Sequence, residues 1–126
     1  MAHIIFDIDP MGAPRMTKSD TWKRRPVVVR YWAFKDAIRL ISARHKYELG
    51  EALDVRFELP MPQGWRKKDK EAMRGKPHQQ KPDVDNMAKA VMDAFKIDDS
   101  HVHTLKASKV WADKGRIIIT ITEVLP

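Results

Sequence analysis

The sequence predicts a two-layer α+β domain, in which helices pack against a single mixed sheet of about four strands. Segments with apolar residues at every second position predict strands, and segments with apolar residues every three or four positions predict helices. The two kinds of segment are interspersed along 126 residues, a length typical of one domain. Because amphipathic helices must bury their apolar stripe, packing on one sheet is the simplest arrangement. We therefore expect residues 1–126 to form a single domain, whose strand order the sequence leaves open.

The first part of the chain predicts a strand, a basic loop and a helix. Apolar residues occupy alternate positions over residues 4–8, the period of a strand with one buried face. Residues 15–30 are rich in Lys and Arg and have no clear period, so we expect a loop that includes a short extended segment at 27–29. Apolar residues then recur every three to four positions over 31–45, which predicts a helix.

The remainder predicts three strands, a basic segment and a second long helix. Residues 53–59 alternate regularly, with apolar side chains expected toward the core and charged side chains toward water. Residues 66–81 are basic and predict one or two helical turns followed by a loop, and residues 83–95 predict an amphipathic helix. Residues 102–111 and 116–124 predict two strands, which we expect to pair as a hairpin.

Composition restricts the partners and the chemistry. Lys and Arg number 24 against 17 Asp and Glu, which gives a net charge of +7 and favours polyanionic partners, nucleic acid first and acidic membrane surfaces second. The absence of Cys excludes disulfides, thiolate zinc sites and cysteine nucleophiles. No apolar run has the length of a membrane span, and the first residues do not resemble a signal peptide. We therefore expect a soluble, cytoplasmic protein.

Two acidic pairs lie among the basic segments: Asp83 and Asp85 at the start of the second long helix, and Asp98 and Asp99 beyond its end. A helix over residues 86–95 rises about 15 Å, and the linker that follows spans at most about 14 Å, so the second pair can return to the first. Carboxylates about 4 Å apart repel by roughly 1 kcal/mol in water and about 4 kcal/mol in a partly screened site. Because Mg²⁺ prefers carboxylate oxygens, converging pairs would form a site for one or two Mg²⁺ ions.

Each pair also has an ordinary structural interpretation. An Asp in the first turn of a helix is favoured by capping and by the helix dipole, at about 0.3–1 kcal/mol. Asp85 and Lys89 lie four residues apart and could form a surface ion pair worth about 0.2–0.5 kcal/mol. Asp98 and Asp99 suit a turn before a strand. The residue pattern alone leaves both the cap and the metal site open.

Residues 81–95, Lys-Pro-Asp-Val-Asp-Asn-Met-Ala-Lys-Ala-Val-Met-Asp-Ala-Phe, together with Asp-Asp-Ser at 98–100, resemble the signature of the RusA family of Holliday junction resolvases. Gly-Ala-Pro-Arg at 12–15 resembles the turn after the family's first strand, and Trp-Arg-Lys-Lys at 65–68 resembles its basic segment. The resemblance covers most of the chain. It implies an Mg²⁺-dependent endodeoxyribonuclease of bacterial or phage origin. Such an enzyme forms a homodimer that binds four-way DNA junctions and nicks two strands symmetrically in DNA recombination and repair.

The resemblance also implies which residues act. By motif position, three aspartates that hold the metal match Asp83, Asp85 and Asp99, and the assisting lysine matches Lys89. Asp98 remains an alternative third ligand, because the connection after the helix is shorter than in some members. We hypothesise that the metal activates water against the scissile phosphate and that Lys89 neutralises the charge that develops there.

The two basic stretches are the expected DNA-contacting surfaces, because phosphate contacts supply most protein–DNA hydrogen bonds. Binding should therefore weaken steeply with salt. Two other functions stay open: a non-catalytic DNA-binding module, and a metal-dependent nuclease that acts on other branched DNA. The candidate contact residues are Arg15, Lys18, Lys23, Arg24, Arg25, Trp65, Arg66, Lys67, Lys68, Lys76, His78 and Lys81.

Overall fold

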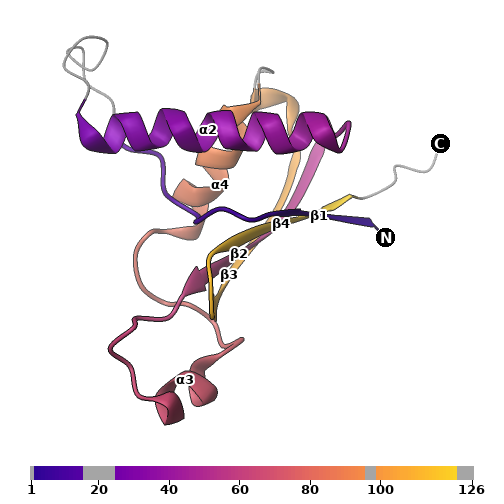
Figure 1. Ribbon diagram of the computed structural model, residues 1–126. Helices are drawn as coiled ribbons and strands as arrows, with labels where there is room; N and C mark the ends of the chain where they lie inside the picture. Colours follow the sequence, from indigo (N-terminus) through magenta and orange to yellow (C-terminus); the bar gives the residue numbers. More distant parts are fainter. Residues whose placement is uncertain (1, 16–24, 96–98, 122–126) are drawn as a thin grey trace.

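A computed structural model describes residues 2–15, 25–95 and 99–121, and confirms the two-layer α+β fold (Figure 1). Two long helices cover a four-stranded mixed sheet, and a short third helix stands apart from them beyond one end of the sheet. The elements are β1 (Ala2–Phe6), α2 (Pro26–Arg44), β2 (Ala52–Pro60), α3 (Lys67–Met73), α4 (Val84–Ala94), the 3-10 helix η1 (Asp99–His101), β3 (Thr104–Ala112) and β4 (Arg116–Ile121).

The strand order is β1-β4-β2-β3, so the hairpin predicted between the last two strands is wrong. Strand β2 lies between them: it pairs parallel with β3 and antiparallel with β4, and β4 pairs antiparallel with β1. Two strands separated by a third lie about 10 Å apart, and the four Cα steps from Ala112 to Arg116 span up to about 14 Å. The loop is therefore long enough to pass over the end of β2, which it does.

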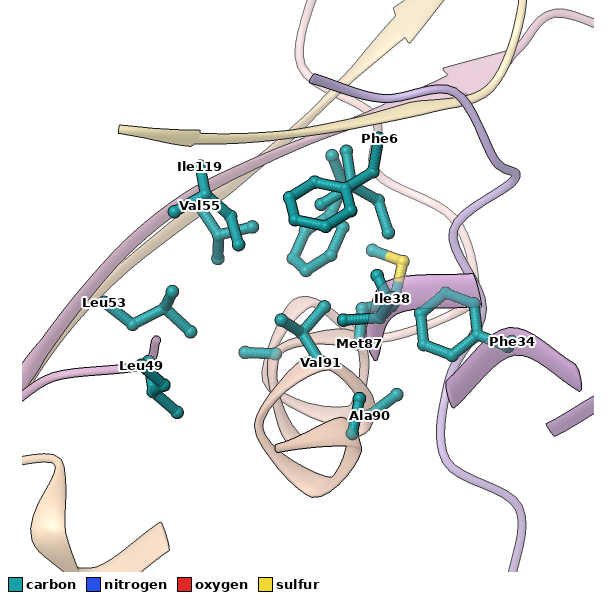
Figure 2. Close-up of a cluster of buried hydrophobic side chains, with 14 of the residues drawn as sticks. Phe6, Phe34, Ile38, Leu49, Leu53, Val55, Met87, Ala90, Val91 and Ile119 are labelled. Atoms are coloured by element: carbon teal, nitrogen blue, oxygen red, sulfur yellow. The ribbon is translucent and has the colours of Figure 1, made fainter. Parts of the chain in front are cut away.

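The core lies between the helices and one face of the sheet (Figure 2). The apolar side chains of β2 predicted to face the core are buried, and β1 and β4 of the same sheet contribute Phe6 and Ile119. Helix α4 presents Met87, Val91 and three alanines, whose small side chains allow close approach to the sheet. Among the described residues, no helix combines the length and the apolar character needed to cross a membrane.

Helix α2 begins earlier than predicted, because residues 27–29 form its first turn instead of an extended segment. Pro26 occupies the start of the helix, where its missing N–H costs no hydrogen bond. Val28 is fully buried. Burial in the core therefore outweighs the weak preference of β-branched valines for extended backbone.

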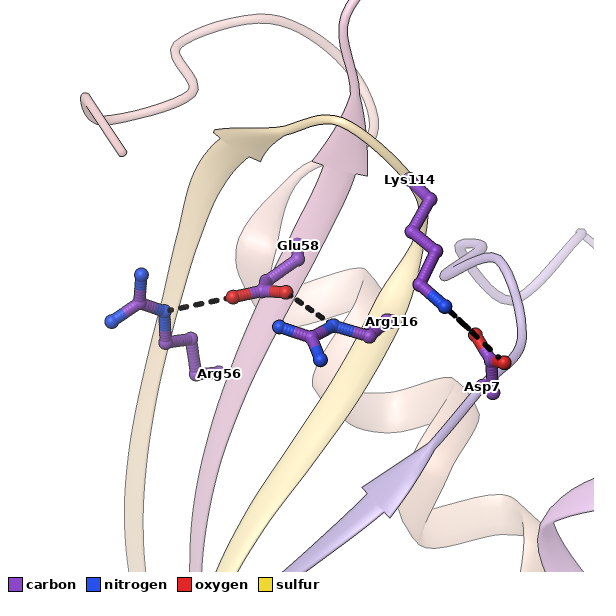
Figure 3. Close-up of polar contacts among 5 residues, drawn as sticks. All are labelled: Asp7, Arg56, Glu58, Lys114 and Arg116. Atoms are coloured by element: carbon purple, nitrogen blue, oxygen red, sulfur yellow. Dashed lines mark hydrogen bonds and ion pairs between the residues drawn. The ribbon is translucent and has the colours of Figure 1, made fainter. Parts of the chain in front are cut away.

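On the face of the sheet opposite the long helices, one charged residue that the sequence pattern predicts to face water is instead buried. Glu58 on β2 is only 8% exposed, so the expectation that all charged residues of this strand face solvent is wrong at this position. Its carboxylate accepts a hydrogen bond from Arg116 Nε at 2.7 Å and lies 3.8 Å from Arg56 Nε (Figure 3). Two flanking guanidinium groups compensate its burial.

Candidate functional site

The two aspartates of the first acidic pair lie at the exposed N-terminus of α4. Asp83 is the N-cap residue, as predicted, and its backbone carbonyl accepts the N–H of Met87 at 3.1 Å. Its side chain makes no capping hydrogen bond, and the carboxylate is exposed. Asp85, in the first turn, is also exposed, and its Oδ1 accepts the N–H of Asn86 at 2.9 Å. Helix capping therefore does not occupy the Asp83 carboxylate.

Lys89 lies one turn further along α4 and pairs with Asp93. Its Nζ is 3.8 Å from Asp93 Oδ1, and within the described residues no Asp85–Lys89 ion pair forms. The other Asp93 oxygen accepts the hydroxyl of Tyr31 on α2 at 2.8 Å. Burial, and then this hydrogen bond, raise the pKa of Tyr31 above its ordinary value. Asp93 thus links Lys89 to the adjacent helix and leaves the Asp85 carboxylate free of the lysine.

A loop from the N-terminal region closes over the start of α4. The side-chain amide of Asn86 donates to the Ala13 carbonyl at 3.1 Å, and the Ala13 N–H donates to the Asn86 carbonyl at 3.4 Å. Gly12 lies so close that a Cβ there would be 2.6 Å from Asn86 Nδ2. An open hollow lined by Gly12, Lys81, Pro82, Asp83 and Asn86 results. The contact between Asn86 and this loop was not predicted from the sequence, because it joins residues 73 positions apart.

The segment that leads into Asp83 is fixed along the outer edge of β3. Pro77 and Val110 form an antiparallel bridge, and the His78 N–H donates to the Lys109 carbonyl at 3.0 Å. The Lys109 ammonium then donates to the carbonyl of Pro82 at 2.7 Å and to the carbonyl of Gln80. Lys109 was not identified from sequence, because nothing in a strand residue's local pattern indicates a contact with a segment 27 residues earlier.

The second acidic pair falls largely outside the described part of the chain. Asp98 is not among the described residues, and Asp99 is described only as the first backbone position of η1. Among the described residues, no group of three or more Asp, Glu or His side chains is placed to hold a metal. The donors present, two exposed carboxylates separated by one residue, are the hard oxygen ligands that Mg²⁺ takes, so they fit part of its coordination shell.

Most candidate DNA contacts that the structure describes are exposed. Arg25 and Trp65 are partly buried, and the Arg25 guanidinium donates to the Arg15 carbonyl at 3.0 Å. Lys18, Lys23 and Arg24 lie outside the described residues. The exposed candidates are Arg15, Arg66, Lys67, Lys68, Lys76 and Lys81.

His78 differs from the other candidates because it is only 5% exposed, whereas a histidine in a loop is usually solvated. Its ring packs on Trp111 with centroids 4.2 Å apart, and its Nδ1 accepts the N–H of Gln80 at 3.5 Å. Burial, and then the nearby charge of Lys109, lower the pKa of His78 below its ordinary value. The structure therefore places a neutral, packed side chain where the sequence suggested a phosphate contact.

The chain is similar to known proteins over most of its length. A family model described as endodeoxyribonuclease RusA matches residues 7–122, which include every described element from α2 to β4. The uncharacterized protein YqaN of Bacillus subtilis (strain 168) is 35% identical over 128 residues, which cover 91% of this chain and 87% of YqaN.

Proposed function

Because the chain belongs to the RusA family of endodeoxyribonucleases, the Holliday junction resolvases, we propose that it resolves four-way DNA junctions by paired symmetric Mg²⁺-dependent nicks in recombination and repair. The observation that carries this proposal is the start of α4. There Asp83 and Asp85 are exposed, unpaired with Lys89, and held in place by contacts from the Ala13 loop and from β3. Helix capping does not explain the Asp83 carboxylate, which makes no capping hydrogen bond.

The proposed roles follow from these positions. Asp83 and Asp85 would hold the ion together with Asp99, or alternatively Asp98. Bound Mg²⁺ supplies a Lewis acid for the phosphoryl group and lowers the pKa of water. Lys89, one helical turn from Asp85 and exposed, would neutralise negative charge at the phosphate. Asn86 and Lys109 would position the two carboxylates without touching DNA.

The proposed DNA-binding surface surrounds this site. Lys81 lines the same hollow as Asp83, and Arg15 follows Ala13 by two residues, so it lies within about 7 Å of the loop that Asn86 holds. Arg66, Lys67 and Lys68 extend the positive charge to α3. These cations would offset the repulsion between the aspartates and DNA phosphates, which supports a nucleic-acid substrate.

We also propose that the enzyme acts as a homodimer, because two symmetric nicks require two active sites related by a two-fold axis. The helix-free face of the sheet leaves room for a partner: Ile5 on β1 is 48% exposed. Sedimentation of the purified protein should show a dimer at micromolar concentration. A monomer that cleaves both strands of a junction independently would contradict this part of the proposal.

Substituting Asp85→Asn tests the catalytic assignment. We expect cleavage of a labelled four-way junction with Mg²⁺ to fall at least about 100-fold, because a ligand that must be anionic has been neutralised. Junction binding without Mg²⁺ should be unchanged or tighter, because one negative charge near the phosphates is removed. Asp36→Asn, the same charge change at an exposed position of α2, is the matched control and should cleave normally.

The same assay separates the alternatives. If the wild-type protein binds the junction but leaves it intact with Mg²⁺, the non-catalytic DNA-binding function is correct. If it cleaves flaps or nicked duplex faster than four-way junctions, it is a nuclease for other branched DNA. Equal cleavage by Asp85→Asn and the wild type would show that the acidic pair at α4 is not the catalytic site.

A further inference from the structure

A groove separate from the acidic hollow lies between α3 and the segment that precedes Lys81. It has a volume of about 460 Å³ and is lined by two tryptophans, Met73, Pro77, Asp69 and two glutamines. Among the residues that the structure describes, no Lys or Arg side chain lines it. Its lining is thus aromatic and apolar, with amide groups and a single carboxylate, which is the composition of a small-molecule or base-binding site and not of a phosphate site.

The two tryptophans differ in exposure, and this difference defines the groove's binding surface. Trp111 is only 5% exposed, and its ring contacts both the buried His78 ring and the Trp65 ring. The Trp65 and Trp111 ring centroids are 4.9 Å apart. Trp65 is only partly buried, so its ring is the one that a ligand can reach. A buried neighbour holds this ring in a fixed orientation, which is favourable for stacking a flat group.

Charge indicates which flat group this is. Three lining residues have an exposed cation as their neighbour in the chain. Arg66 follows Trp65, Lys76 precedes Pro77, and Lys81 follows Gln80. The lining includes the exposed Asp69, whose carboxylate would repel a phosphate. An aromatic lining that repels phosphate, bordered by cations, matches a nucleotide whose base enters the groove and whose phosphates stay outside.

The groove is also close to the acidic site, and hydrogen bonds from one side chain hold the segment between them. Gln80 lines the groove and Asp83 lines the hollow, and three Cα steps separate them by at most about 11 Å. Lys109 donates to the carbonyls of both Gln80 and Pro82, so one side chain fixes both edges. A short stretch of one DNA strand can therefore reach both places.

We propose that this groove binds a single unpaired nucleobase, stacked on Trp65, from the DNA strand whose phosphate lies at Asp83 and Asp85. This inference rests on the proposed function, because it takes branched DNA as the ligand. Taking a base out of a duplex costs the free energy of unpairing and unstacking, which binding in the groove would offset. Gln79 and Gln80 offer side-chain amides, each with donors and an acceptor, to the edge of the bound base.

A double-mutant cycle between protein and DNA tests the proposal. Four-way junctions carrying one abasic nucleotide at successive positions near the branch point are bound, without Mg²⁺, to the wild type and to Trp65→Ala. We expect Trp65→Ala to weaken binding of the intact junction roughly 5- to 100-fold. One abasic position should weaken wild-type binding by a similar factor and have no further effect on Trp65→Ala.

Two variants control for charge and folding. Trp65→Phe keeps an aromatic ring and should retain most of the affinity, and Trp32→Phe, on α2 away from the groove, should bind normally. The dependence of binding on salt should be the same for Trp65→Ala and the wild type, because no charge is removed. A wild-type abasic series in which no position weakens binding would overturn the proposal even if Trp65→Ala does not fold.

The outcomes also distinguish this inference from the proposed function. Independent, additive effects of Trp65→Ala and every abasic position would show that the groove holds no base, whereas the wild type would still cleave junctions. Failure of the wild type to cleave any branched DNA would instead contradict the proposed function, and the cycle would then report only on binding.

Discussion

Asn86 and Gly12 act together at the acidic site, although 73 residues separate Asn86 from the Ala13 carbonyl that it holds. The Asn86 side chain can approach the loop only because Gly12 has no Cβ. The turn at Gly12 thus requires glycine for space and not for an unusual backbone angle. This contact brings the exposed Arg15 toward the start of α4.

Gly12→Ala should therefore impair the site more than it impairs folding. A Cβ 2.6 Å from Asn86 Nδ2 forces the amide or the loop to move. We expect junction cleavage to fall about 10- to 100-fold, because small displacements of positioning groups are costly. Chemical denaturation should show a loss of about 1–3 kcal/mol in the free energy of unfolding, typical of overpacking.

Gly64→Ala is the matched control for that measurement, because nothing lies within 4 Å of a Cβ built at Gly64. It should leave cleavage unchanged. Normal cleavage by Gly12→Ala would show that the contact between Asn86 and the loop does not position the catalytic residues.

At the scale of secondary structure, elements with a strong local period were predictable and their partners were not. Strand β2 and helix α4 were predicted within about two residues, because every second or every third to fourth side chain is buried in the core. The pairing of β3 with β2 instead of β4 depends on where α4 returns the chain, which no local pattern contains. The start of α2 was missed for the same reason: burial of Val28 is a tertiary effect.

The outer edge of β3 gives a prediction about how an element positions the site. Lys109→Met removes the donor that binds the carbonyls of Gln80 and Pro82. The segment before Asp83 should then lose its fixed position. We expect cleavage to fall about 10- to 100-fold and the Mg²⁺ concentration for half-maximal cleavage to rise, as is typical when groups that orient metal ligands are removed.

Lys106→Met is the matched control, since Lys106 is exposed on the same strand and pairs in register with Asp54, away from the acidic segment. It makes the same change in charge. If both variants lower cleavage equally and leave the Mg²⁺ dependence unchanged, Lys109 contributes charge to DNA binding and not position to Asp83.

Across the whole molecule, the sequence indicated the position of the acidic motif but not the contacts that surround it. Asp83 and Asp85 were placed correctly because Pro82 and the apolar period of α4 define the helix start locally. The contacts from Asn86 and Lys109 join segments distant in sequence, and only the folded chain brings them together. The meeting of the two acidic pairs stays a prediction, because Asp98 lies outside the described residues.

The buried His78 makes the stability of the whole fold depend on pH. Its pKa in the folded protein lies below the ordinary value of 6.5, so the unfolded chain binds a proton first as pH falls. The free energy of unfolding should therefore decrease below about pH 6.5, by at most about 1.4 kcal/mol per pH unit from this group, until His78 is protonated in the folded state too.

His78→Phe keeps a ring against Trp111 and cannot be protonated. The difference in unfolding free energy between His78→Phe and the wild type, measured by denaturation, should be constant above pH 7.5 and shift in favour of the variant toward pH 5. Parallel pH profiles would contradict the burial of a neutral His78 beside Lys109.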